Sequence, residues 1–194
     1  PMVVPNKTLY RTSGVIQKMM RDTDNISPLR VEGSNLLYVP TMYSANKLYG
    51  PFRNYEDYIY RGWQGELLQM IPNITVKTHP KSLNSWKHDC KKEYRRLTKC
   101  VHEYDGILLD YCSTAATLSF ASDKPIIYFD IGLRSLAPVF YNDLEKRCTI
   151  IPIEFNREWD EQIRSGLRSY EEEKRSSSNL ALEKYSLCNP ERFS

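Results

Sequence analysis

One His-Pro pair, His79 and Pro80, stands between two lysines in the stretch VKTHPKS (76–82). It follows an extended apolar run, and Pro80 disfavours a helix there, so the pair is predicted to end a strand. Histidine titrates near neutral pH and can donate a hydrogen bond to a phosphate or protonate a leaving group. Lys77 and Lys81 would add positive potential. The alternative, which position alone leaves open, is that His79 merely ends the strand.

The stretch DYCSTAA (110–116) is the second feature with chemical potential. It ends the apolar run GILLDY, and Ser113 or Thr114 can cap a helix whose first backbone N–H groups point back towards the strand end. Free N–H groups, the helix dipole and two hydroxyls together suit an anion. The small side chains of Ala115 and Ala116 would let a ligand approach closely. An ordinary helix N-cap without a ligand is the alternative.

A zinc site at His88, Cys90, Cys100 and His102 is disfavoured. On the helix expected over 85–101, residues two positions apart point roughly 200° away from each other, so both halves of the site would splay. We therefore predict no bound metal. The sequence also has no Gly-x-Ser-x-Gly elbow, no Gly-x-Gly-x-x-Gly and no Walker loop, which argues against a serine hydrolase and against NAD or ATP as ligands.

These residues need a scaffold, and short apolar runs rich in β-forming residues supply one. The runs lie at 35–40, 74–80, 106–111, 125–130 and 148–153. Because each is nearly continuous in apolar character, we expect parallel strands that are buried on both faces.

Helical patterns separate the apolar runs, at 54–71, 85–101, 113–122 and 158–174. Within the second pattern, apolar side chains recur every three or four residues, at Trp86, Cys90, Tyr94, Leu97 and Val101. Strands that alternate with helices predict right-handed crossovers and a mostly parallel sheet. The predicted fold class is therefore α/β, a Rossmann-like three-layer domain. We place this domain at 35–175, after a leading segment or linker at 1–34 and before a C-terminal tail at 176–194.

Ligands of open parallel sheets bind beyond the carboxyl ends of the strands. That rule predicts one edge for the candidate binding residues, which are Thr41, Lys77, His79, Asp110, Cys112, Ser113, Thr114 and Asp130. We expect the His-Pro strand end and the Ser-Thr helix start on neighbouring strands, facing one anion.

The order of these motifs resembles the C-terminal, donor-binding half of GT-B transferases. A strand ending in KTHP precedes a basic helix and then YDGILLDYCSTAATLSFASDKPIIYFD. This layout is similar to that of bacterial cell-surface polysaccharide enzymes with a His-Pro motif followed by a Ser-Ser or Ser-Thr motif. They include CDP-glycerol glycerophosphotransferases and the sialyl and Kdo transferases that use CMP-sugars. The resemblance covers roughly 35–155, and Cys112 departs from it, standing where a serine is usual.

The resemblance implies a domain that binds a CMP- or CDP-linked donor, whose sugar or glycerol phosphate passes to a cell-surface glycan or lipid-linked glycan. His79 would be catalytic, contacting the donor phosphate or assisting departure of the nucleotide. Ser113, Thr114 and the helix amides would hold that phosphate without a metal or another cofactor. GT-B enzymes need a second half for the acceptor, and this chain is long enough for only one. A nucleotide-sugar epimerase of the same architecture and a non-catalytic Rossmann-like binding or assembly module remain alternatives.

The charge pattern bears on partners. A formal net charge of +3 is too small to argue for nucleic acid. The basic face of the 85–101 helix, at Lys91, Lys92, Arg95, Arg96 and Lys99, fits a solvated surface or a peripheral contact with an anionic membrane. We expect no nucleic acid there, since no base-stacking aromatics interleave with the charges.

The predicted location is the cytoplasm, at the inner face of the cell membrane if the basic helix docks. No segment approaches the ~18 apolar residues of a membrane span. The start of the sequence lacks the layout of a signal peptide. The five scattered cysteines are an odd number and are expected to be reduced.

Overall fold

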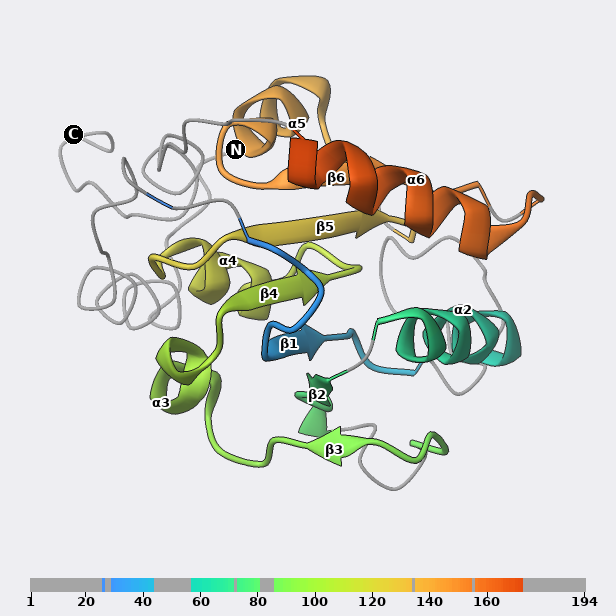
Figure 1. Ribbon diagram of the computed structural model, residues 1–194. Coiled ribbons are helices and arrows are strands. Elements are labelled where there is room, and N and C mark those ends of the chain that lie inside the picture. Colours follow the sequence, from blue (N-terminus) through green and yellow to red (C-terminus); the bar gives the residue numbers. More distant parts are fainter. Residues whose placement is uncertain are drawn as a thin grey trace, which may run out of the picture.

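The computed structural model describes residues 26, 29–43, 57–71, 73–80, 86–133, 135–154 and 156–172. These residues form an α/β domain, in which helices flank a six-stranded, all-parallel sheet (Figure 1). The predicted Rossmann-like three-layer fold class is confirmed. The tail predicted at 176–194 and most of the leading segment predicted at 1–34 lie outside the described residues.

The strands run in the order β3-β2-β1-β4-β5-β6 across the sheet. Their bounds are Leu36–Val39 (β1), Ile74–Val76 (β2), Lys91–Lys92 (β3), Gly106–Leu109 (β4), Ile126–Asp130 (β5) and Thr149–Pro152 (β6). From β1 the chain moves outwards to β3, and it then returns to the other side of β1 to form β4. The register pairs Val39 with Leu109, so the carboxyl ends of β1 and β4 lie side by side. This pair is the topological switch point of the sheet.

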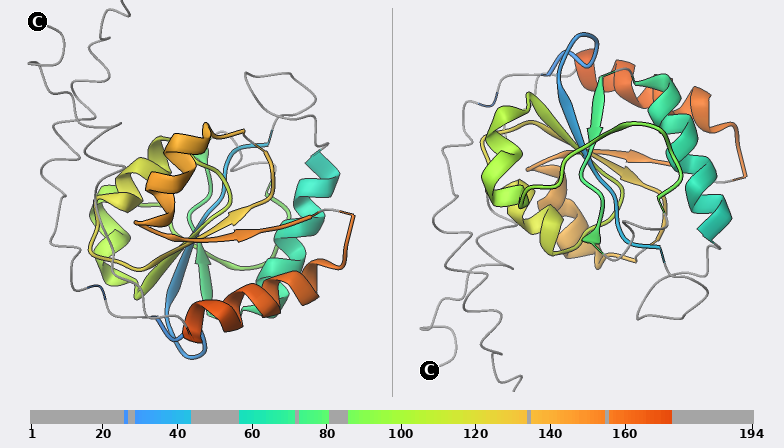
Figure 2. Two further views of the ribbon diagram at one scale, coloured as in Figure 1. Left: turned by 90° about the horizontal axis from the view of Figure 1, so that it is seen from above. Right: turned by 90° about the horizontal axis from the view of Figure 1, so that it is seen from below.

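The change of direction at β1 places helices on opposite faces, because each parallel crossover is right-handed. One face carries α2 (Asp57–Met70) and α6 (Trp159–Glu172). The other carries α3 (Leu97–Cys100), η2 (Val101–Glu103), α4 (Thr114–Phe120) and α5 (Pro138–Glu145). Figure 2 shows the two helical layers on either side of the strongly twisted sheet.

Strand β1 illustrates why the apolar runs are continuous. Leu36 and Tyr38 belong to the core beneath α2 and α6, whereas Leu37 and Val39 belong to the core beneath α3, α4 and α5. All four side chains are buried, so neither face of the strand can be polar.

Residues 29–34 pack against the sheet. Leu29 is buried beside Gly106, where a Cβ would come within 2.3 Å of Leu29 Cδ2. The Leu29 N–H donates to Tyr170 Oη (3.0 Å), and the Val31 N–H donates to Glu171 Oε1 (2.9 Å). The segment therefore links the start of β4 to the end of α6.

The helix predicted over 85–101 is wrong. Lys91 and Lys92 form the edge strand β3, and only Leu97–Cys100 is α-helical. The apolar residues assigned to one helical stripe serve two different cores, since Trp86 packs on the α2 face and Leu97 on the α3 face. Tyr94, between them, is 67% exposed. The spacing of three and four thus arises in a segment that passes around the edge of the sheet.

Candidate functional site

The carboxyl edge of the sheet carries the candidate residues. Thr41 follows β1, Lys77 and His79 follow β2, and Asp130 ends β5. The stretch 110–114 follows β4. Since all strands are parallel, these positions lie along one edge, and the switch point between β1 and β4 lies in their midst.

The prediction that the His-Pro strand end and the Ser-Thr helix start follow neighbouring strands is wrong. Strand β1 separates β2, which precedes His79, from β4, which precedes Ser113. Strands lie about 4.8 Å apart, so two strand spacings put these backbones roughly 10 Å apart along the edge. Only a ligand that lies across the end of β1 can therefore contact both motifs.

Ser113 is the N-cap of α4, as predicted. Its backbone is extended and its Oγ accepts a hydrogen bond from the Ala115 N–H (3.3 Å). Thr114, the first helical residue, is exposed. Ala116 is fully buried in the α4 side of the core, so its small side chain allows α4 to pack closely on the sheet. Ser113 is half-buried and Thr114 is exposed, so solvent or a ligand can reach the start of α4 at these two residues.

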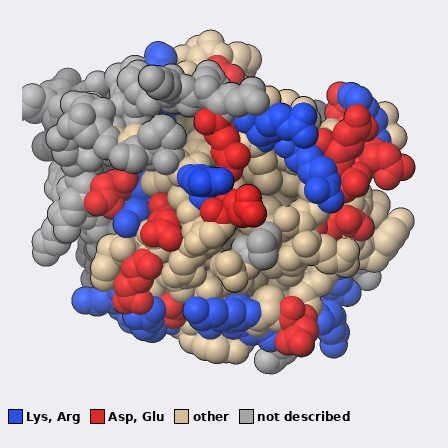
Figure 3. Space-filling view, viewed as in Figure 1, with Lys and Arg blue, Asp and Glu red and all other residues tan. Residues whose placement is uncertain are grey.

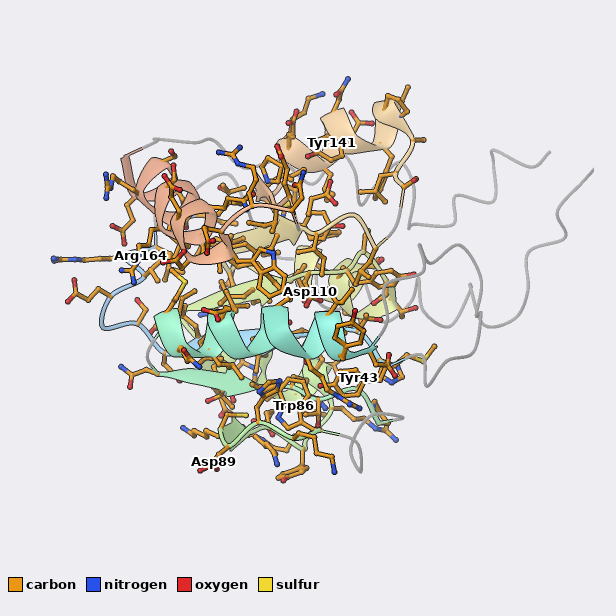
Figure 4. The ribbon with its side chains drawn as sticks, turned by 90° about the vertical axis from the view of Figure 1, so that its right-hand side faces the viewer. Tyr43, Trp86, Asp89, Asp110, Tyr141 and Arg164 are labelled. Carbon is orange, nitrogen blue, oxygen red and sulfur yellow. The ribbon has the colours of Figure 1, made fainter. Side chains whose placement is uncertain are left out.

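Asp110 anchors a buried hydrogen-bond network at the switch point. It directly follows β4 and is 1% exposed. Its Oδ2 accepts hydrogen bonds from Tyr38 Oη and from Tyr60 Oη, the latter at 2.8 Å. Tyr60 Oη accepts in turn from the backbone N–H of Thr41 (3.1 Å). The network thus joins β1, β4, α2 and the chain that leaves β1; Figure 4 shows Asp110 behind α2.

Burial dominates the electrostatics of this network. It raises the pKa of Asp110 to about 6, although the hydrogen bonds from Tyr38 and Tyr60 favour the carboxylate. Burial and the Asp110 charge raise the pKa values of both tyrosines, which keeps them as donors. Asp110 Oδ1 has no hydrogen-bond partner among the described residues, while the nearby Thr41 N–H and Trp63 indole lower the pKa of the carboxyl. We call the carboxyl ends of the strands around β1 and β4 the rim. Asp110 lies beneath this rim and holds it in position through its bonds to Tyr38 and Tyr60.

An aromatic and cationic cluster lies beside α2, next to this rim. The Arg61 guanidinium lies 4.7 Å from the centroid of the Tyr43 ring. Tyr43 stacks on Trp86 (6.2 Å between centroids), and Trp86 meets the edge of His88 (5.2 Å). Tyr43 Oη also donates to Gln64 Oε1 (2.6 Å). Figure 4 shows Tyr43 and Trp86 together on one side of α2.

Arg61 supplies the positive charge of this cluster. Burial lowers the pKa of His88, and the charge of Arg61 lowers it further, so His88 favours its neutral form. Burial raises the pKa of Tyr43 to about 12 despite the nearby Arg61. This cluster could not be predicted from the sequence, because its members come from three separate segments without a shared spacing.

The remaining candidates occupy different environments. Cys112 is 7% exposed and packs in the core on the α4 side. Asp130 is half-buried, and its Oδ1 accepts from the Gly132 N–H (3.1 Å) at a turn where Gly132 has a positive φ. Lys77 is half-buried, and its backbone N–H donates to Tyr38 O (2.8 Å). Lys81 lies outside the described residues.

Within the described ranges, no group of three or more His, Cys, Asp or Glu residues could hold a metal ion. The helix over 85–101, in which the four candidate zinc ligands were expected to splay, does not form. No helix in the described part of the chain is long and apolar enough to cross a membrane.

The fold and the rim together define the class of domain, a Rossmann-like α/β domain with polar groups at its switch point. Comparison with models of protein families, with curated proteins and with solved structures finds no match for this chain. The function must therefore be inferred from the geometry of the rim.

Proposed function

We propose that this chain is the donor-binding domain of a transferase, and that it binds a nucleotide at the β1/β4 switch point. The donor would be CMP- or CDP-linked, and a sugar or glycerol phosphate would pass to a cell-surface glycan. The observation that carries the proposal is the strand order β3-β2-β1-β4-β5-β6, which reverses between β1 and β4. In open parallel sheets this reversal opens a crevice beyond the strand ends, where dinucleotides and other phosphate-bearing ligands bind.

The polar groups around the reversal suit a ligand with separate phosphate and nucleoside parts. Ser113, Thr114 and the first amides of α4 would hold one phosphate, since hydroxyl and backbone N–H donors stabilise an anion. His79 lies on the far side of β1, roughly 10 Å along the edge. There it would contact the donor phosphate or give a proton to the departing group. A CMP-linked and a CDP-linked donor both fit this spacing.

Asp110 takes a positioning role in this proposal. Its bonds to Tyr38 and Tyr60 fix the carboxyl ends of β1 and β4, and Tyr60 holds the backbone of Thr41. A ligand would then meet a rim whose backbone is already ordered, which lowers the entropic cost of binding.

Calorimetric titration with CMP, CDP, UDP and ADP tests the proposal, using a matched pair of variants. Ser113→Asn and Ser113→Asp both keep a good N-cap, but only the aspartate places a negative charge at the phosphate position. We expect saturable binding of CDP by the wild type, a modest loss in Ser113→Asn and at least a tenfold loss in Ser113→Asp. His79→Ala should also weaken the binding of CDP.

Each other outcome discriminates. Preferential binding of UDP would keep a nucleotide site but discard the cytidine donor. Equal affinity of Ser113→Asn and Ser113→Asp for CDP would show that the phosphate does not bind at the start of α4. No binding of any nucleotide by the folded wild type would contradict the proposal for this chain and favour a binding or assembly module.

A further inference from the structure

The outer strand β3 and the segments beside it carry five cations and one exposed tyrosine. Four of the cations are exposed and Lys92 is half-buried, with its side chain on the opposite face of the strand from that of Lys91. We call this group the basic edge: Lys87, Lys91, Lys92, Tyr94, Arg96 and Lys99. Lys91 and Lys92 form β3, which pairs with β2 alone, and Lys99 lies on α3. Tyr94 is 67% exposed and sits between the lysines of β3 and Arg96. In Figure 3, Lys and Arg side chains lie along the lower margin with acidic side chains among them, where Figure 1 places β3 and α3.

Ion pairs hold one cation of this stretch within the described part of the chain, and the exposed Asp89 lies between Lys87 and Lys91. The paired cation is Arg95, which contacts both Glu93 and Glu103 at 2.6 Å. The lysines and Arg96 make no ion pair with any described residue. The basic edge therefore differs from the basic helix face predicted from the sequence. It leaves out Arg95, which is paired, and adds Lys87 and the exposed Tyr94. It consists of four ammonium groups, one guanidinium group and one aromatic ring.

The backbone beneath the basic edge is held in place. Glu93, next to β3, accepts hydrogen bonds from the N–H and guanidinium of Arg95 and from Tyr104 Oη (3.1 Å). Arg95 also clamps Glu103 in η2. These hydrogen bonds order the backbone that carries the cations, so binding a partner has a smaller entropic cost for this backbone.

We propose that the basic edge docks this protein on a membrane surface rich in anionic phospholipid. Lysine ammonium groups are compact point charges that suit a diffuse negative surface, whereas bidentate recognition of single phosphates favours arginine. Tyrosine is enriched where apolar and wet environments meet, so Tyr94 suits the headgroup region. Single-stranded nucleic acid fits less well, because successive bases stack on several aromatics and the basic edge exposes one.

The expected strength follows from the charges. Each lysine or arginine near an anionic leaflet strengthens binding roughly fivefold, so removing two should weaken it roughly 25-fold. The contact should also weaken steeply with salt, as the Debye length shortens from about 10 Å at 0.1 M towards 3 Å at 1 M. This docking is independent of nucleotide binding at the switch point.

Vesicle co-sedimentation of the full chain tests the proposal, with vesicles of phosphatidylcholine alone and with 30% phosphatidylglycerol added. Lys91→Gln/Lys92→Gln should lower the partition coefficient on the anionic vesicles roughly 25-fold. Tyr94→Ser should lower it a few-fold. The matched control is Arg164→Gln/Arg168→Gln, which removes two exposed cations from α6 and should leave partition within twofold. Circular dichroism would verify that each variant is folded.

Three results would overturn the proposal. They are no binding to anionic vesicles at 50 mM salt, an equal loss in the α6 control, and tighter binding to a 20-nucleotide oligothymidine than to the vesicles at 150 mM salt. The last result would assign the basic edge to nucleic acid instead.

Discussion

Replacing Asp110 with asparagine should remove a pH dependence of folding that this carboxyl imposes. Asparagine has nearly the same shape, and its amide oxygen can accept the hydrogen bonds that Tyr38 and Tyr60 donate to Oδ2. What it cannot do is ionise inside the protein. The variant therefore separates the hydrogen-bonding role of residue 110 from the cost of burying its charge.

The magnitude follows from the two pKa values. The pKa of Asp110 rises from 3.8 to about 6 on folding, so between these values the folded state keeps a proton that the unfolded state has lost. Stability must then fall as pH rises through this window, because the unfolded state binds fewer protons. A shift of about 2 units corresponds to roughly 3 kcal/mol in total, with a slope of at most about 1.4 kcal/mol per pH unit. Above pH 6 the whole cost is present, and below pH 4 it is relieved.

Urea unfolding followed by tryptophan fluorescence at pH 4, 5, 6 and 7.5 measures this difference directly. Relative to wild type, Asp110→Asn should gain about 2–2.5 kcal/mol in the free energy of unfolding between pH 4 and pH 7.5, because part of the effect already falls below pH 4. Asp123→Asn, at an exposed position before β5, is the matched control and should show no such gain. If the free energy of unfolding varied with pH in parallel for Asp110→Asn and wild type, the prediction would be refuted. Folding would then not raise the pKa of Asp110.

Three further predictions concern the scaffold, each measured by urea unfolding. Arg147, 3% exposed, donates to the carbonyls of Phe120, Ser122 and Lys124, so Arg147→Met should cost about 3 kcal/mol by leaving them without these donors; a loss below about 1 kcal/mol would contradict this role. Hydrogen bonds from Arg95 lower the pKa of Glu93 from 4.5 to about 2, so Glu93 stabilises the fold above pH 4.5 and this contribution disappears as pH falls towards 2. The stability gap between wild type and Glu93→Gln should therefore close on acidification, whereas a constant gap would rule out this linkage. Gly106→Ala forces a Cβ against Leu29 and should cost about 1–3 kcal/mol, and in the Leu29→Ala background the added cost should vanish.

The strands of the sheet centre were predictable because burial on both faces leaves a local mark. Runs such as LLYV in β1 and IIYF in β5 are apolar at every position, and this continuity is visible in the sequence. Strand β3 leaves no such mark. It is an edge strand of two lysines, and its flanking apolar residues serve different cores, so their spacing imitated a helix.

The candidate site divides in the same way. That Ser113 caps a helix after β4 was predictable, because N-cap chemistry acts over a few residues. The network of Asp110 was not, since its partners Tyr38 and Tyr60 lie 72 and 50 positions away. Nor does the sequence reveal that β1 separates β2 from β4. Neighbours in a sheet depend on how the crossovers pass over it, which no local pattern encodes.

Amide chemical-shift mapping of a CDP titration would locate the nucleotide that we propose to bind at the carboxyl ends of β1 and β4. We expect the largest saturable shifts at residues 110–116 and 77–79, with Thr41 also affected. Amides at the opposite edge, at Asp105, Lys124 and Cys148, should remain unchanged. Shifts that concentrate at this opposite edge, or no saturable shifts from the folded protein, would contradict this proposal.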